Sequence, residues 1–163
     1  PYFRPYTGTD VVGTEIAGAV KNVIALAVGM AEGLGFGDNS KASLITRGLA
    51  ETMRLGMAIG GEAPTFAGLV GVGDLIATCM SPLSRNQSFG VKLGQGLSVD
   101  EVVAQTSQTA EGVKSCTSIL DLARKNGVDV PIIEQVHAMI VEGRTAEDVV
   151  RALLSRPRKA EVD

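Results

Sequence analysis

The chain has 163 residues, of which 45% are hydrophobic, 20% charged and only 4% aromatic, and its net charge is −3. These fractions are ordinary for a globular protein, and the acidic balance argues against a general nucleic-acid-binding function. Two cysteines and one histidine are too few for a disulfide framework or a structural zinc site, so we expect no metal. A chain of this length is expected to form one domain, or at most one domain with a small appendage, and to bury roughly 70% of its unfolded surface.

No segment predicts a membrane anchor. The longest apolar runs, such as Val23–Gly29, are shorter than the ~20 residues that cross a bilayer, and no signal peptide opens the chain. We therefore expect a cytoplasmic protein without membrane insertion. Because the first residue is proline rather than methionine, we also expect a fragment of a longer protein.

The first third of the chain predicts a connecting segment and two helices. Residues 1–12 are expected to form an extended connection or an edge strand, with a turn at Thr7–Asp10. Apolar residues at helical spacing then predict a helix over about 14–32. A second helix is expected to open at Asp38–Ser40 and to end at Gly60–Gly61.

The remainder also reads as helical, with one exception. A short helix is expected after Pro64 and another over 75–80, whereas the polar residues 81–90 predict an irregular loop, the kind of segment that carries function. Capping residues and glycine stops place four further helices at about 98–105, 109–125, 131–142 and 145–154. The pattern predicts an all-α domain of seven or eight helices over 13–155, followed by a charged tail at 156–163.

Two glycine-rich segments invite comparison with a dinucleotide-binding loop. Gly33–Gly37 and Gly71–Gly73 do not complete G-x-G-x-x-G, and neither follows a predicted strand. We interpret them as turns and close helix contacts.

Lys21 is the first candidate for chemistry. It lies in a strongly apolar helix, and its neighbours at steps of three and four are Ala17, Gly18, Ile24 and Ala25. Desolvation would lower the pKa of such a lysine and suit it to acid–base chemistry, with Asn22 beside it to orient a bound group. The alternative, which this helix alone favours, is a lysine at the edge of an apolar stripe with its ammonium in solvent.

Asp74 lies between Gly73 and an apolar helix, where the simplest role is an N-cap. It could equally hold a lysine in place. Thr78 follows one turn later, so it would face the same side and could supply a hydroxyl to the same site.

The triplet Ser84, Arg85 and Asn86 lies in the predicted polar loop. A guanidinium beside hydroxyl and amide groups suits the oxygens of a phosphate. A solvated surface loop is the alternative, and on local grounds the two are even.

Several segments of the chain resemble the bacterial branch of the NAD(P)-dependent glycerol-3-phosphate dehydrogenases. They are Gly13–Val23, Asn39–Ala42, Ile45–Gly48, Gly71–Leu75, Thr78–Cys79, Ser84–Asn86, Phe89–Gly90, Leu93–Gly96 and Ala110–Gly112. The resemblance covers essentially the whole chain. It implies an all-α, multi-helix C-terminal domain of the 6-phosphogluconate dehydrogenase C-terminal-like type, with the Rossmann domain absent and residues 1–12 leading from it.

The resemblance also implies roles around a catalytic lysine. Lys21 matches the lysine that binds the substrate and protonates the developing alkoxide as hydride reaches dihydroxyacetone phosphate. Asn22, Asp74 and Thr78 match residues around that lysine and the substrate.

A second set of positions matches groups that bind anions. Arg85 and Asn86 match groups that hold the substrate phosphate, with Ser84 beside them. Arg85 and Glu111 also match positions that reach the cofactor; from the residues alone, Glu111 resembles an ordinary acid in the first turn of a helix.

The resemblance thus implies the substrate-binding half of an enzyme that converts dihydroxyacetone phosphate and NAD(P)H into sn-glycerol 3-phosphate and NAD(P)+, a precursor step for glycerophospholipids. NAD or NADP would be bound mainly by the absent N-terminal domain, so the isolated chain should not turn over; a homodimer is a further expectation. One alternative is a non-catalytic helical module that assembles oligomers or binds phosphorylated metabolites. Another is a related dehydrogenase that acts on a different small hydroxy acid.

Overall fold

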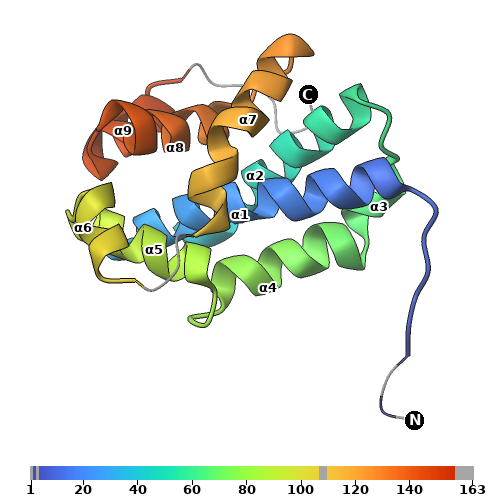
Figure 1. Cartoon of the computed structure of the whole chain (residues 1–163), viewed down its shortest axis with the longest axis horizontal. Helices are drawn as coiled ribbons and strands as arrows, with labels where there is room; N and C mark the ends of the chain where they lie inside the picture. The colour runs from blue at the N-terminus through green and yellow to red at the C-terminus, as the bar shows by residue number, and fades with distance from the viewer. Residues whose placement is uncertain (1, 3, 107–109, 157–163) are drawn as a thin grey trace.

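The computed structural model describes residues 2, 4–106 and 110–156, and it is built from helices (Figure 1). In chain order these are α1 (Val11–Gly33), α2 (Asp38–Ala58), α3 (Ala63–Ala67), the π-helical turn η1 (Leu69–Gly73), α4 (Asp74–Met80), α5 (Arg85–Gly94), α6 (Val99–Ala104), α7 (Glu111–Lys125), α8 (Pro131–Glu142) and α9 (Ala146–Leu154). These ranges and the segments between them contain no strand, which confirms the predicted all-α class. The edge strand considered for the opening segment is therefore not formed by its described residues.

Parts of three predictions cannot be compared with the structure. The expected helix start at Thr109, residues 1 and 3 of the connecting segment and the charged tail beyond residue 156 lie outside the described residues. The helix predicted from residue 109 is described from Glu111 onward as α7. The boundary at residue 12 between connecting segment and domain stays a prediction, although α1 already begins at Val11.

The helix α1 forms the centre of the domain. It crosses the middle of the molecule in Figure 1, and α2, α4, α5, α7 and α8 all pack against it. Thirteen of its 23 residues are buried, most of them Val, Ile, Leu, Ala or Met. By length and composition alone α1 could also cross a membrane, but the core helix of a globular domain passes the same test, and half of its most apolar stretch is buried here.

Asp10 fixes the start of α1 against α3. Its carboxylate accepts hydrogen bonds from the backbone N–H of Gly13 at 2.8 Å, the backbone N–H of Glu62 at 2.8 Å and the hydroxyl of Thr65 at 2.6 Å. These three donors, with Thr65 contributing most, lower the pKa of the Asp10 carboxyl. The predicted turn before this helix is thus an N-cap that also joins two elements.

The crossing of α1 and α5 depends on glycines. A Cβ atom on Gly29 would lie 2.1 Å from the carbonyl oxygen of Gln87, and one on Gly90 would lie 2.2 Å from that of Leu26. The backbones therefore touch, and no side chain larger than hydrogen fits between them. Gly33 makes the same kind of approach, 2.2 Å from the carbonyl oxygen of Val91, which confirms its interpretation as a close helix contact.

The prediction of an irregular loop over residues 81–90 is confirmed for residues 81–84 and wrong from Arg85, where α5 begins. The hydroxyl of Ser84 caps this helix by accepting the N–H of Gln87 at 3.3 Å. Two of the polar residues that suggested a solvated loop are instead buried against α1: the side-chain amide of Gln87 donates to Glu32 at 3.1 Å, and that of Asn86 donates to Asn22 at 2.9 Å. These two polar side chains bond to another helix rather than to solvent.

A buried carboxylate joins α2 to α8. Glu51 is only 1% exposed, and its carboxylate accepts the backbone N–H groups of Ile132 at 2.8 Å and Ile133 at 3.3 Å, in the first turn of α8. Burial raises the pKa of Glu51 to about 7; the two N–H donors and the nearby Arg54 only partly oppose this effect. Nothing in the local sequence marked this residue, since its partners are 81 and 82 positions away.

The free energy of unfolding should depend on pH through Glu51. Its pKa is higher in the folded chain, about 7, than the ordinary 4.5, so the folded state binds the proton more tightly. This stabilisation is complete below pH 4.5 and is lost as the pH rises through 7, a change on the order of 2–3 kcal/mol between pH 5 and 8. Urea unfolding of the wild type and Glu51→Gln at both pH values isolates this contribution. Parallel pH profiles of the two proteins would show that Glu51 does not titrate in this way.

Candidate functional site

Lys21, Asp74 and Thr78 form one polar group between α1 and α4. The ammonium of Lys21 makes an ion pair with one carboxylate oxygen of Asp74, and the hydroxyl of Thr78 donates to the other oxygen at 3.3 Å. Asp74 does not cap α4; Gly73 holds that position. The sequence allows two roles for Asp74, an N-cap and a partner that holds a lysine, and the structure shows the second. Thr78 faces the same side as Asp74, as predicted.

Lys21 is neither isolated nor fully withdrawn from water. Its side chain remains 23% exposed, and that of Asp74 is 39% exposed. A small bound molecule can therefore reach the ammonium from solvent while Asp74 holds it. The geometry combines both sequence interpretations: Lys21 lies at the edge of the apolar stripe, and it points at a partner that fixes its position.

The π-helical turn η1 immediately precedes Asp74 and places it in contact with Lys21. It connects α3 directly to α4, and the N–H of Gly73 bonds to the carbonyl of Gly68 at 3.3 Å. A Cβ atom on Gly71 would lie 2.0 Å from the carbonyl oxygen of Phe66, so only glycine allows the chain to wind this closely. Single π-helical turns are frequent at functional sites. The Gly71–Gly73 segment is thus a close helix contact, as predicted, rather than a nucleotide-binding loop.

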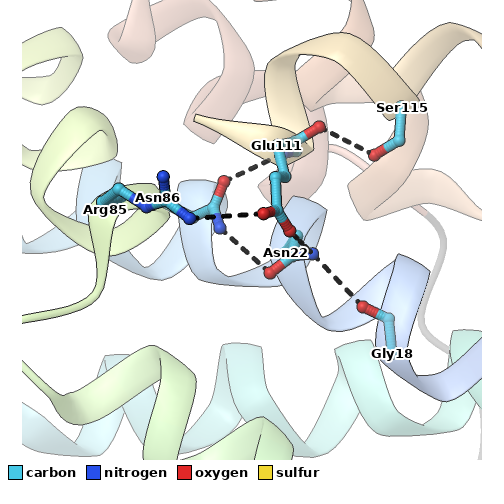
Figure 2. Close-up of polar contacts among 7 residues, drawn as sticks. Gly18, Asn22, Arg85, Asn86, Glu111 and Ser115 are labelled. Carbon is cyan, nitrogen blue, oxygen red and sulfur yellow. Dashed lines mark hydrogen bonds and ion pairs between the residues drawn. The ribbon is translucent and has the colours of Figure 1, made fainter. Parts of the chain in front are cut away.

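A second polar group links α1, α5 and the start of α7 (Figure 2). The side-chain amide of Asn86 donates to the amide oxygen of Asn22 at 2.9 Å, while its own oxygen accepts the backbone N–H of Gly112 at 2.8 Å. Asn22 in turn donates to the carbonyl of Gly18 at 3.2 Å. Both asparagines are buried, so their hydrogen bonds hold three helices in one arrangement.

Arg85 and Glu111 lie at the exposed edge of this group (Figure 2). The guanidinium of Arg85 contacts one carboxylate oxygen of Glu111 at 3.3 Å, and the amide of Asn22 donates to the other at 3.3 Å. The Arg85 and Glu111 side chains are 55% and 63% exposed, so both are open to a ligand in solution.

The two polar groups share α1, because Lys21 and Asn22 are consecutive in that helix. The structure therefore joins the predicted site residues in two groups, Lys21 with Asp74 and Thr78, and Asn22 with Arg85, Asn86 and Glu111. The hydroxyl of Ser84 belongs to neither group and caps α5. The sequence reasoning missed Gly112 as a participant. Its N–H bonds to Asn86, and a Cβ atom on it would lie 2.6 Å from the carbonyl oxygen of Asn22. Only its place in the resemblance motif Ala110–Gly112 could have drawn attention to it.

The part of the chain that the structure describes offers no group of three or more His, Cys, Asp or Glu side chains that could hold a metal ion. Cys79 and Cys116 are buried core residues, as predicted, and burial raises the pKa of each thiol to about 12. Neither thiol is therefore a nucleophile at neutral pH.

A cavity of about 770 Å³ lies on another part of the surface, between α1, α2, α8 and α9. Its lining is largely apolar, and it includes Arg47 and Glu51 but none of the predicted site residues. We place the candidate site at the two polar groups because they combine a positioned ammonium, a guanidinium and fixed amides, which the cavity does not.

Comparison with known proteins identifies the family of this chain. Residues 10–151 match the family model described as the NAD-dependent glycerol-3-phosphate dehydrogenase C-terminus. The chain is 65% identical over 161 residues to the NAD(P)+ glycerol-3-phosphate dehydrogenase of Thermobifida fusca and 63% identical to that of Streptomyces coelicolor. In both cases the match covers 99% of this chain and 48% of the relative, so the chain spans about half the length of these proteins.

Solved structures show the same relationship. The chain superimposes on glycerol-3-phosphate dehydrogenase from Coxiella burnetii with a TM-score of 0.92 and 40% identity, covering 96% of this chain and 48% of that one. For the enzyme from Saccharomyces cerevisiae the TM-score is 0.81, with 29% identity over 93% of this chain and 46% of the yeast chain. With a family match over residues 10–151, this chain belongs to the NAD-dependent glycerol-3-phosphate dehydrogenase C-terminus family.

Proposed function

We propose that this chain is the substrate-binding half of a cytoplasmic glycerol-3-phosphate dehydrogenase, which reduces dihydroxyacetone phosphate with NAD(P)H to sn-glycerol 3-phosphate. The observation that carries the proposal is the Lys21–Asp74 ion pair, on a chain that shares 65% identity with a relative of that name. Asn22, the residue after Lys21 in α1, bonds to the Glu111 carboxylate that Arg85 also contacts. The product is a small phosphomonoester that supplies the backbone of glycerophospholipids.

Lys21 acts as the proton donor in this proposal. When bound, the nicotinamide supplies the hydride that forms the new C–H bond at the carbonyl carbon. Lys21 gives a proton to the carbonyl oxygen as negative charge develops there, becomes neutral and is reprotonated from solvent. Asp74 and Thr78 are positioning residues, because they hold the ammonium in one place through contacts with each other. In the reverse direction the neutral lysine takes the hydroxyl proton.

Arg85 anchors the substrate phosphate. A guanidinium presents several N–H groups in a planar fork, which matches two phosphate oxygens, and more than half of this side chain is exposed. Contacts of Ser84 and Asn86 with the phosphate stay predictions. The Ser84 hydroxyl already accepts an N–H, and both polar atoms of the Asn86 amide already have partners.

The cofactor, NAD or NADP, is held mainly by a part of the enzyme beyond this chain. The described residues contain no strand that leads into a glycine-rich loop, so they cannot cradle a dinucleotide pyrophosphate in the usual way. Arg85 and Glu111 fit an accessory role, since both are exposed at the edge of the site and carry groups that bond to polar parts of a nucleotide. By itself the chain is expected to bind substrate without turning it over.

Substitution of Arg85 by alanine tests the phosphate anchor. We expect the dissociation constant for sn-glycerol 3-phosphate, measured by calorimetry on the chain, to rise about 10- to 100-fold, because a charge-assisted contact is lost. Arg144→Ala is a matched control: Arg144 is 50% exposed and also makes an ion pair at 3.3 Å, with Glu142. Equal affinities of the wild type and Arg85→Ala would favour a module that does not bind phosphorylated metabolites at this site.

A further inference from the structure

The Glu111 carboxylate, at the exposed edge of the site, contacts two donors, the Arg85 guanidinium and the Asn22 amide. One oxygen contacts the guanidinium of Arg85, and the other accepts the amide N–H of Asn22, each at 3.3 Å (Figure 2). A phosphate oxygen would need the same guanidinium. The Glu111 carboxylate therefore lies where the phosphate of the substrate is proposed to bind.

The backbone of Glu111 is held in place by its neighbour. The N–H of Gly112 donates to the buried Asn86 side chain at 2.8 Å, and a Cβ atom on Gly112 would lie only 2.6 Å from the carbonyl oxygen of Asn22, so the two backbones are in close contact. The start of α7 is thus fixed against α1 and α5, while the Glu111 side chain itself remains 63% exposed. The carboxylate can change partner without any movement of the helices.

We propose that Glu111 is an internal competitor of the substrate phosphate: its carboxylate neutralises Arg85 when the site is empty and releases Arg85 when a phosphomonoester binds. This inference rests on the proposed function and adds a residue that sets the affinity for the substrate. Exposed ion pairs contribute little to stability, so the contact breaks easily. A phosphomonoester carries close to two negative charges and binds a guanidinium through two oxygens, so it displaces a single carboxylate.

Glu111→Gln tests the competition directly. The amide keeps an oxygen for Asn22 but removes the negative charge, so the chain should bind sn-glycerol 3-phosphate about two- to fivefold more tightly, the range expected for an exposed ion pair. The gain should shrink as salt is added, because screening weakens the charge that the substitution removes. A purely structural role would predict weaker binding and no such salt dependence.

The control is Glu147→Gln, which makes the same change of charge on an exposed residue of α9. This helix packs against α8, away from the site, and the affinity of the control should equal that of the wild type. Unchanged or weaker binding by Glu111→Gln, with measurable binding by the wild type, overturns the role of Glu111 but leaves the proposed function intact. Absence of binding by both proteins overturns the two proposals together.

Discussion

Replacing Lys21 with alanine is expected to reduce turnover by about 10²- to 10⁴-fold, the contribution of a positioned acid or base. Without the ammonium, the carbonyl oxygen has no proton source where negative charge develops. The fold should survive, because Lys21 is 23% exposed and Asp74, 39% exposed, becomes solvated when its partner is lost. The thermal midpoint should therefore change little, since partly exposed ion pairs contribute ~1 kcal/mol or less.

The measurement uses an enzyme that contains this chain together with a cofactor-binding half. Because the chain is 65% identical to its counterpart in the Thermobifida fusca relative and covers 48% of that protein, it can replace the corresponding half there. NAD(P)H oxidation with dihydroxyacetone phosphate then reports turnover.

Two further variants sharpen this experiment. Lys21→Arg keeps the positive charge but cannot give up a proton, so it should be as inactive as Lys21→Ala. Lys125→Ala removes an exposed lysine at the end of α7 and should leave activity unchanged. Wild-type turnover by Lys21→Ala would rule out the proposed proton donor.

Replacing Gly90 with alanine is expected to destabilise the domain by about 3–4 kcal/mol, at the upper end of the cost of overpacking. The added Cβ would lie 2.2 Å from the carbonyl oxygen of Leu26 and 3.0 Å from the backbone nitrogen of Met30. These are backbone atoms of the central helix, so no side chain can move aside, and α5 must shift away from α1. For a domain of this size the loss corresponds to a fall of about 6–16 °C in the thermal midpoint.

Gly18→Ala provides the matched control, because Gly18 is also helical and nothing lies within 4 Å of its Cβ position. Alanine should stabilise the protein there by up to about 1 kcal/mol through its higher helix propensity. Thermal unfolding of both variants, followed by circular dichroism, compares one substitution in two surroundings. Similar midpoints for the two variants would contradict the close α1–α5 crossing.

Helices with strong local signals could be predicted from the sequence. Ser98 and Glu101 form the predicted capping box of α6, in which the side chain of each residue accepts the backbone N–H of the other. Pro131 occupies the first turn of α8, and Gly143 ends that helix in the left-handed conformation that glycine adopts without strain. These features depend on residues within a few positions of one another, so a pattern of residue types suffices.

The candidate site could be predicted only in part, and for a physical reason. Lys21, Asp74 and Arg85 stood out because their charges suit the chemistry, but which of them meet depends on partners far apart in the chain, 53 residues for Lys21 and Asp74. The loop prediction failed over residues 85–90 for the same reason, since Asn86 and Gln87 bond to α1 rather than to water.

By itself the sequence determined the class of the domain, most of its helices and the residue types available for chemistry, because these follow from local spacing, capping and composition. The tertiary structure decided which polar side chains are buried. It also decided that Glu111 pairs with Arg85 and that Glu51 accepts a backbone N–H at the start of α8. Desolvation, ion pairing and close backbone contact depend on which helices touch, and that arrangement is set by the whole core rather than by any one segment.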